Sequence, residues 1–194
     1  MDALEILTDL ENVFPFFQPI FSADEHRVIG YEILGRYKTE GEYESLGPFF
    51  LDEKIPEEYR VEVDNHILKK ALQLCLTLDS DIYIFINRDA DLLMHGDEEE
   101  LLKMLLEFEK KGISMNRIVL EISERNYHGD IEHLDHLLNY YRTYGIRIAV
   151  DKLGNDRSHL DRIGQISPNI LKVDLLALRS TNTSPGFQDI IYSL

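Results

Sequence analysis

The sequence predicts an α/β fold built on a mostly parallel sheet. Short apolar, β-branched runs alternate with longer segments in which apolar residues recur at helical spacing. Strand–helix alternation at this spacing is typical of βαβ units, and the uniformly apolar strands are typical of a sheet that is covered on both faces. Neither an internal repeat nor a low-complexity linker divides the 194 residues. We therefore expect one domain with a single core.

Two strand-like runs and one long helical segment form the first part of the chain. FFQPIF (16–21) and RVIGYEILG (27–35) predict strands, and a polar, glycine-containing connection through GPFFLDEKIPEEY follows. From residue 61 to residue 78 the apolar residues keep a helical period, and Cys75 falls within that stripe, so we expect it in the core. Because Cys75 is the only cysteine, no internal disulfide can form, which favours a reducing compartment.

The remaining elements alternate to the end of the sequence. DIYIFIN (81–87) predicts a strand, and EEELLKMLLEFEKKG predicts an amphipathic helix that Gly112 ends. NRIVLEISE predicts the next strand. Asp130 is the expected N-cap of the helix IEHLDHLLNYYRTY, which Gly145 ends. IRIAVD and NILKVDL predict two more strands, and GFQDIIYSL looks like the start of a helix, which gives about six strand–helix units.

The net charge of −16 limits the partners that the protein can have. A surface this acidic repels polyanions, so we expect no DNA or RNA binding. A small anionic ligand still fits if metal ions or a few local basic residues receive it. The N-terminus has no basic, apolar leader and no segment approaches the ~20 apolar residues of a membrane helix. We expect a cytoplasmic domain.

Polar side chains recur at the C-terminal ends of four successive predicted strands. They are Asn87, Glu121 with Glu124, Asp151, and Lys172 with Asp174. In a parallel β/α barrel these ends converge on one mouth, where active sites are built. Each residue on its own could instead cap a helix or form a turn. Their recurrence on four strands favours a shared site.

The motifs that hold these residues resemble those of the EAL domain family. YEILGR (31–36) resembles the Glu-Ala-Leu signature, with Ile in place of Ala. FFQPIF, EVDNHIL, FIN, LEISE, AVDKLG and LKVD stand in the family's order, from about residue 16 to the last residue. The sequence is most similar to the YkuI-type subgroup, in which a C-terminal sensory domain follows. The resemblance implies a TIM-like β/α barrel that binds cyclic di-GMP, and active members hydrolyse it to the linear dinucleotide.

The resemblance also implies roles for seven residues. The positions of the family's metal ligands are held by Glu32, Asn87, Glu121 and Asp151. Lys172 matches the lysine that orients water or phosphate, Arg36 matches an arginine that contacts a ligand phosphate, and Glu124 matches a glutamate that braces the loop after Asp151. Such oxygen ligands suit Mg²⁺ or Mn²⁺, whereas Ca²⁺ can bind without supporting turnover. Each residue has a plainer alternative: a salt bridge for the acids, Asp174 or Asp151 as partner of Lys172, solvent for Arg36, and a helix start for Glu124.

The loop after the IRIAVD strand departs from the family pattern. Active members have two adjacent aspartates there, whereas this chain keeps Asp151, has Lys152 in place of the second acid and Asp156 in place of a glycine. Two unit charges ~4 Å apart interact by roughly 4 kcal/mol at an effective dielectric of ~20, and ~1.4 kcal/mol is a tenfold change in affinity. We therefore expect weakened binding of a second cation. Alternatively, Lys152 points to solvent, and only the lost ligand matters.

The sequence also stops short of a closed barrel, which needs eight β/α units. We expect the general-base glutamate of the family and part of the guanine-binding wall beyond Leu194. Loss of a general base alone costs about 10²–10⁴-fold in rate, so the chain as it stands is expected to be inactive or nearly so. The expected full-length protein also has the C-terminal sensory domain, and a homodimer is one option.

Three functions therefore stay open. The first is recognition of cyclic di-GMP with impaired hydrolysis, the second is active phosphodiesterase function in the full-length protein, and the third is a non-catalytic interaction module. His133 and His136 lie on one face of a predicted helix and could form a zinc pair. No cysteine or second cluster accompanies them, so a solvated helix surface is the favoured explanation.

Overall fold

The computed structural model describes residues 3–95, 98–123, 129–150 and 165–172. Its strands are β1 (Val13–Ser22), β2 (Arg27–Thr39), β3 (Glu42–Ser45), β4 (Tyr83–Asp89), β5 (Ile118–Ser123), β6 (Arg147–Val150) and β7 (Ile170–Leu171). Its α-helices are α1 (Ala3–Thr8), α2 (Gly47–Leu51), α3 (Glu57–Cys75), α4 (Ala90–His95), α5 (Glu98–Lys110) and α6 (Ile131–Thr143). Two short 3₁₀ helices are η1 (Leu10–Asn12) and η2 (Met115–Arg117).

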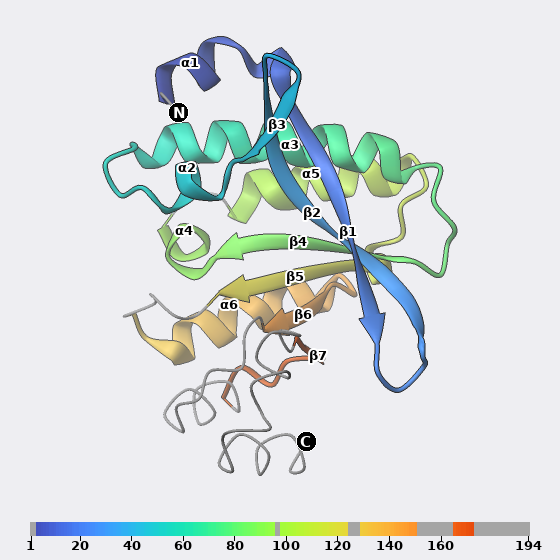
Figure 1. The fold of residues 1–194 in the computed structure, drawn as a ribbon. Coiled ribbons are helices and arrows are strands. Elements are labelled where there is room, and N and C mark those ends of the chain that lie inside the picture. The colour runs from blue at the N-terminus through green and yellow to red at the C-terminus, as the bar shows by residue number, and fades with distance from the viewer. Residues whose placement is uncertain (1–2, 96–97, 124–128, 151–164, 173–194) are drawn as a thin grey trace, which may run out of the picture.

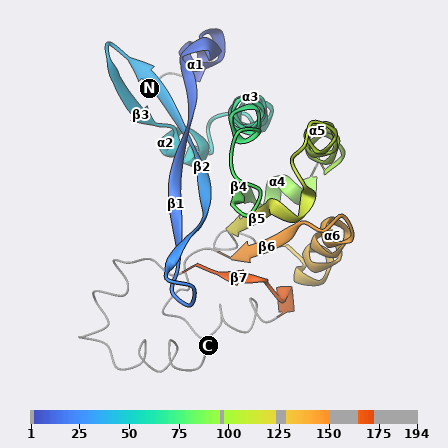
Figure 2. The same cartoon turned by 90° about the vertical axis from the view of Figure 1, so that its right-hand side faces the viewer.

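One sheet organises the described residues, with strand order β1-β2-β4-β5-β6-β7 and β3 beside β2. The strands β2, β4, β5, β6 and β7 are parallel. Helices α3, α5 and α6 lie on one face of this sheet (Figures 1 and 2). This arrangement is that of an incomplete β/α barrel with its helices outside. The predicted fold class is confirmed.

Strands β1 and β3 differ from the parallel majority because both pair antiparallel with β2. The sequence analysis assigned no strand to the residues of β3, all four of which are exposed. Glu40 and Gly41 both have positive φ, at 32° and 99°, and they join Thr39 to its partner Glu42. A two-residue turn of this kind matches the twist of an antiparallel pair. The turn therefore explains why β3 forms although its exposed residues show no apolar pattern that would predict a strand.

The core forms on both faces of the sheet because strand side chains alternate. Ile84 and Ile86 of β4 belong to the large cluster under the helices, which also contains the buried Cys75. Burial raises the pKa of the Cys75 thiol to about 11, although nearby Arg117 lowers it. Phe85 of β4 and Val119 of β5 point to the opposite face, where they form a smaller cluster with Ala149. That second face is the inner side of the barrel.

Local signals set the ends of the helices as the sequence predicted. The Asp130 carboxylate accepts a hydrogen bond from the Glu132 amide at 2.9 Å and so caps α6. Gly112 after α5 and Gly145 after α6 have φ values of 118° and 86°, which glycine adopts most easily. Within the described ranges, no helix combines the length and apolar character that crossing a membrane requires.

We expect Gly30→Ala to destabilise the protein by about 1–3 kcal/mol. Gly30 of β2 pairs with Tyr83 of β4, and an added Cβ would lie 2.6 Å from a ring carbon of Phe85 and 2.7 Å from the Tyr83 carbonyl oxygen. The backbone of β4 cannot move without disturbing the sheet. Urea unfolding measures the loss. The control is Gly47→Ala, whose Cβ would come no closer than 3.3 Å to the Ser45 hydroxyl; equal losses in both variants would contradict this account.

Candidate functional site

Side chains from three parallel strands and one strand end meet at the C-terminal edge of the sheet. Glu32 lies on β2, Asn87 on β4, Glu121 on β5, and Lys172 directly follows β7. Asn87 and Glu121 are paired in register. They lie two residues beyond the buried pair Phe85 and Val119, so they extend the same inner face. The apolar layer thus forms the floor of a polar site.

Hydrogen bonds and ion pairs connect these four side chains. Asn87 Nδ2 donates to Glu32 Oε1 at 2.8 Å. Lys172 Nζ lies 2.7 Å from Glu32 Oε2 and 2.5 Å from Glu121 Oε2. The ammonium group therefore bridges two carboxylates that come from different strands.

The bridging ammonium lies in a site of low solvent exposure. Only 13% of the Lys172 side chain, 14% of Glu32 and 1% of Glu121 is exposed. Burial alone lowers the pKa of Lys172, but the carboxylates of Glu121 and Glu32 outweigh it and raise the pKa above its ordinary value. The lysine is consequently charged at neutral pH. Its Nζ also lies 6.0 Å from the centroid of the Phe85 ring, above the apolar floor.

The residues present fit a hard divalent cation. Carboxylate and amide oxygens are the ligands that Mg²⁺, Mn²⁺ and Ca²⁺ prefer. Glu32 and Glu121 place two carboxylates around one point, and the Asn87 amide lies against Glu32. The Lys172 ammonium supplies positive charge at that point in the described structure. Asn87 presents its NH₂ group to Glu32, so its amide would turn over to offer oxygen to a metal.

Arg36 lies on the same face of β2 as Glu32 but outside the four-residue cluster. Its Nη1 donates to the Gly35 carbonyl at 2.9 Å, and its guanidinium carbon lies 5.6 Å from the centroid of the Phe16 ring. Arg36 lies four positions further along the strand than Glu32, or about 13 Å. The predicted phosphate contact is thus placed further along the strand than the ion-pair cluster.

The other predicted site residues lie outside the described residues. These are Glu124, Asp151, Lys152, Asp156 and Asp174. Their roles stay predictions from the sequence. Among the described residues, no group of three or more His, Cys, Asp and Glu side chains could hold a metal ion, because the described part of the site contributes only two residues of these types, Glu32 and Glu121, beside Asn87. His133 is exposed and lies 3.5 Å from the Asp130 carboxylate, so the zinc pair gains no support.

One partly buried ion pair beside the site was missed by the sequence analysis. Arg88, which follows Asn87 on β4, pairs through Nη1 with Asp64 of α3, and the Arg88 side chain is only 8% exposed. The same Nη1 donates to the Asn87 carbonyl at 3.1 Å. The pair fastens α3 to the strand end that carries Asn87. Asp64 belongs to the EVDNHIL segment, but nothing in the sequence identifies Arg88 as its partner.

The fold and the polar strand ends define a β/α-barrel domain of the EAL class, and the chain belongs to the EAL domain family, which matches residues 1–194. The EAL-domain containing protein YkuI of Bacillus subtilis is 54% identical over 194 residues, covering all of this chain and 48% of YkuI. The crystal structure of YkuI in complex with the substrate c-di-GMP and calcium superposes with a TM-score of 0.90. The superposition covers all of this chain and 48% of the YkuI chain in that structure.

More distant relatives support the same classification. The probable cyclic di-GMP phosphodiesterase PdeG of Escherichia coli is 26% identical over 180 residues, covering 89% of this chain and 34% of PdeG. The manganese and c-di-GMP complex of Klebsiella pneumoniae BlrP1 shares the fold, with a TM-score of 0.69 at 22% identity over 93% of this chain and 48% of BlrP1. The chain therefore spans about half the length, or less, of these relatives.

Proposed function

We propose that the protein containing this chain recognises cyclic di-GMP at a divalent-metal site formed by Glu32, Asn87, Glu121 and Asp151. The observation that carries the proposal is the convergence of the Glu32 and Glu121 carboxylates on one cation position, the Lys172 ammonium, with Asn87 hydrogen-bonded to Glu32 beside it. The 54% identity to YkuI, which was crystallised with c-di-GMP and calcium, supports cyclic di-GMP as the ligand. We further propose that the protein is cytoplasmic. A homodimer is one oligomeric state that fits this proposal.

Charge explains why a cation is needed. The chain carries a net charge of −16, and cyclic di-GMP is an anion with two phosphodiesters. A bound Mg²⁺ or Mn²⁺ would attract the phosphate and lower the pKa of a coordinated water, whereas Ca²⁺ would hold the ligand without supporting turnover. We assign to Lys172 the role of orienting phosphate or water beside the ion, and to Arg36 that of receiving a phosphate further along β2. For Glu124, which lies outside the described residues, we propose the role that the family resemblance implies, bracing the loop after Asp151.

Hydrolysis by this chain is proposed to be slow or absent. Lys152 replaces an acid that active members of the family carry, which weakens a second metal ion. The general base is proposed to follow Leu194, where the remaining strands would complete the barrel and a sensory domain would follow. We propose that the chain is a single EAL-type domain with about six of the eight β/α units of a closed barrel.

Calorimetric titration of the full-length protein with cyclic di-GMP tests the proposal. We expect binding in Mg²⁺, Mn²⁺ or Ca²⁺ and a loss of at least tenfold in affinity in a chelator, with little linear dinucleotide formed. Rapid turnover in Mg²⁺ or Mn²⁺ would establish an active phosphodiesterase instead. Absence of binding in every cation would overturn the proposal and favour an interaction module that no longer binds nucleotide.

Lys152→Asp is expected to strengthen Mg²⁺ binding by tenfold or more. The change removes an ammonium and restores a carboxylate, so the local charge falls by about two units, and a single unit charge ~4 Å away is worth roughly 4 kcal/mol at a dielectric of ~20. Mg²⁺ titration of the full-length protein measures the effect. Lys111→Asp on the outer surface is the control for net charge. An unchanged or lower affinity in Lys152→Asp would refute the electrostatic account of this loop.

A further inference from the structure

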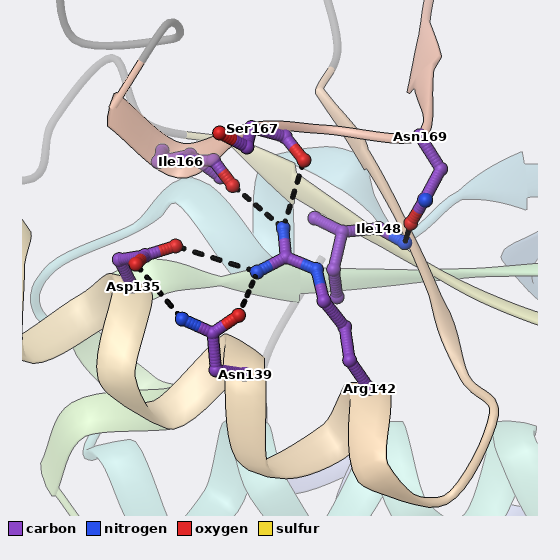
Figure 3. Close-up of polar contacts among 7 residues, drawn as sticks. All are labelled: Asp135, Asn139, Arg142, Ile148, Ile166, Ser167 and Asn169. Atoms are coloured by element: carbon purple, nitrogen blue, oxygen red, sulfur yellow. Dashed lines mark hydrogen bonds and ion pairs between the residues drawn. The ribbon is translucent and has the colours of Figure 1, made fainter.

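A single arginine of α6 holds the segment that leads to β7. Arg142 Nη2 donates to the carbonyl oxygens of Ile166 and Ser167, at 2.6 and 3.0 Å. Its Nη1 donates to Asn139 Oδ1 at 2.7 Å and lies 3.3 Å from Asp135 Oδ1. Figure 3 shows the guanidinium between these two sets of acceptors. Arg142 therefore joins the outer helix to the loop before β7.

The loop that Arg142 holds has a demanding conformation. Ser167 has a φ of 49°, which non-glycine residues seldom adopt, so surrounding contacts must enforce it. Ile166 is fully buried in the main core and anchors the loop from the other side. Nη2 alone satisfies the two successive carbonyl groups that the bend turns toward α6, while Nη1 of the same planar group reaches the acceptors on α6 itself. Lysine could not serve the loop carbonyls and the α6 acceptors from two separate nitrogens, because only arginine presents a rigid planar fork.

The residues after Ser167 are joined to strand β6 by hydrogen bonds. Asn169 Oδ1 accepts from the Ile148 amide at 2.9 Å, and the Asn169 amide donates to the Ile148 carbonyl at 2.8 Å. The Lys172 amide then donates to the Val150 carbonyl at 3.0 Å. The register of β7 on β6 is thus set at both of its ends, and Lys172 is the first residue past it.

We propose that Arg142 is a positioning residue that sets the Lys172 ammonium between Glu32 and Glu121. None of the Arg142 contacts described above is with one of the four site residues. Arg142 acts instead through the bend at Ile166 and Ser167 and through the two hydrogen bonds between Asn169 and Ile148. β7 has only two residues, so its own ladder cannot fix Lys172 firmly. A shift of ~1 Å in a positioned group can cost about 10²-fold in function. The consequence for ligand binding rests on the proposed function, whereas the position of Lys172 does not.

The first test observes Lys172 without nucleotide. The ammonium group of a buried, ion-paired lysine gives a ¹H–¹⁵N correlation in the metal-free full-length protein, and through-bond transfer assigns it. We expect Arg142→Met to shift or broaden this signal, and Arg142→Lys to retain part of the wild-type signal. Arg147→Met is the control, because Arg147 is exposed and stacks on Tyr83, 4.6 Å from the ring centroid. An unchanged Lys172 signal in folded Arg142→Met would overturn the inference.

The second test is a double-mutant cycle on Ca²⁺-dependent cyclic di-GMP affinity. We expect Arg142→Met to weaken binding about tenfold or more, and Arg142→Met with Lys172→Met to bind no worse than Lys172→Met alone. A role in general stability only would make the two losses additive, and additivity would overturn the inference. If wild-type protein binds no nucleotide, the proposed function fails, and the nucleotide-free spectra still decide the role of Arg142.

Discussion

Lys172→Met is expected to destabilise the metal-free protein by roughly 3–5 kcal/mol, which is the usual cost of breaking a buried ion pair by removing one partner. The Lys172 ammonium lies within 2.7 Å of Glu32 Oε2 and 2.5 Å of Glu121 Oε2. Without it, two carboxylates of low exposure face each other. Because the charge of Glu121 is held at 1% exposure, solvent cannot replace the lost ammonium.

Divalent cations are expected to restore much of that stability, because the site needs positive charge and not lysine as such. A cation at 100 times its dissociation constant stabilises the folded state by about 2.7 kcal/mol. Pulse alkylation of the buried Cys75 across a urea series, read by peptide mass spectrometry, reports the unfolding of this domain within the longer protein. Lys103→Met is the control, since Lys103 makes only an exposed pair with Glu99. Wild-type stability of Lys172→Met in chelator would contradict the prediction.

Glu121→Gln is expected to lower metal-dependent cyclic di-GMP affinity by at least 100-fold. The substitution keeps the shape of the side chain but removes one of the carboxylate charges at the cation position. At an effective dielectric of ~20, a unit charge ~4 Å from another is worth roughly 4 kcal/mol, and about 2.8 kcal/mol corresponds to 100-fold. Lys172 keeps its 2.7 Å contact with Glu32, so the domain is expected to fold.

The two variants differ in their response to metal, and this difference makes the pair informative. Added Mg²⁺ or Ca²⁺ is expected to stabilise Lys172→Met strongly and Glu121→Gln hardly at all. Glu109→Gln removes the same charge from an exposed position on α5 and is expected to bind nucleotide within twofold of wild type. Wild-type affinity in Glu121→Gln, measured by the same calorimetry, would exclude Glu121 as a metal ligand.

The elements that could be predicted from the sequence are those with a regular pattern of apolar residues or a clear end signal. The parallel strands β4 and β5 were predictable because apolar residues run through them to a polar end, and α6 because Asp130 caps it and Gly145 follows it. β3 was not, because its four exposed residues carry no burial pattern and only the Glu40–Gly41 turn forms it. The motifs that carried the family resemblance also identified the residues that meet at the strand ends.

The contacts that complete the site were not predictable from spacing. Lys172 pairs with Glu32, 140 residues away, and with Glu121, whereas the sequence suggested Asp151 or Asp174 as alternatives close to it. Only the closing of β7 against β6 brings this lysine over the inner face of β2. Arg88 and Arg142 escaped notice for the same reason, since each acts on backbone or side chains of another element.

Anomalous diffraction from crystals of the full-length protein grown with Mn²⁺ tests the central claim most directly. We predict a metal peak between the carboxylates of Glu32 and Glu121, with the Asn87 oxygen among the ligands and the Lys172 ammonium displaced from its bridging position toward phosphate or water. A structure in Mn²⁺ that retains the Lys172 bridge and has no metal between these carboxylates would contradict it.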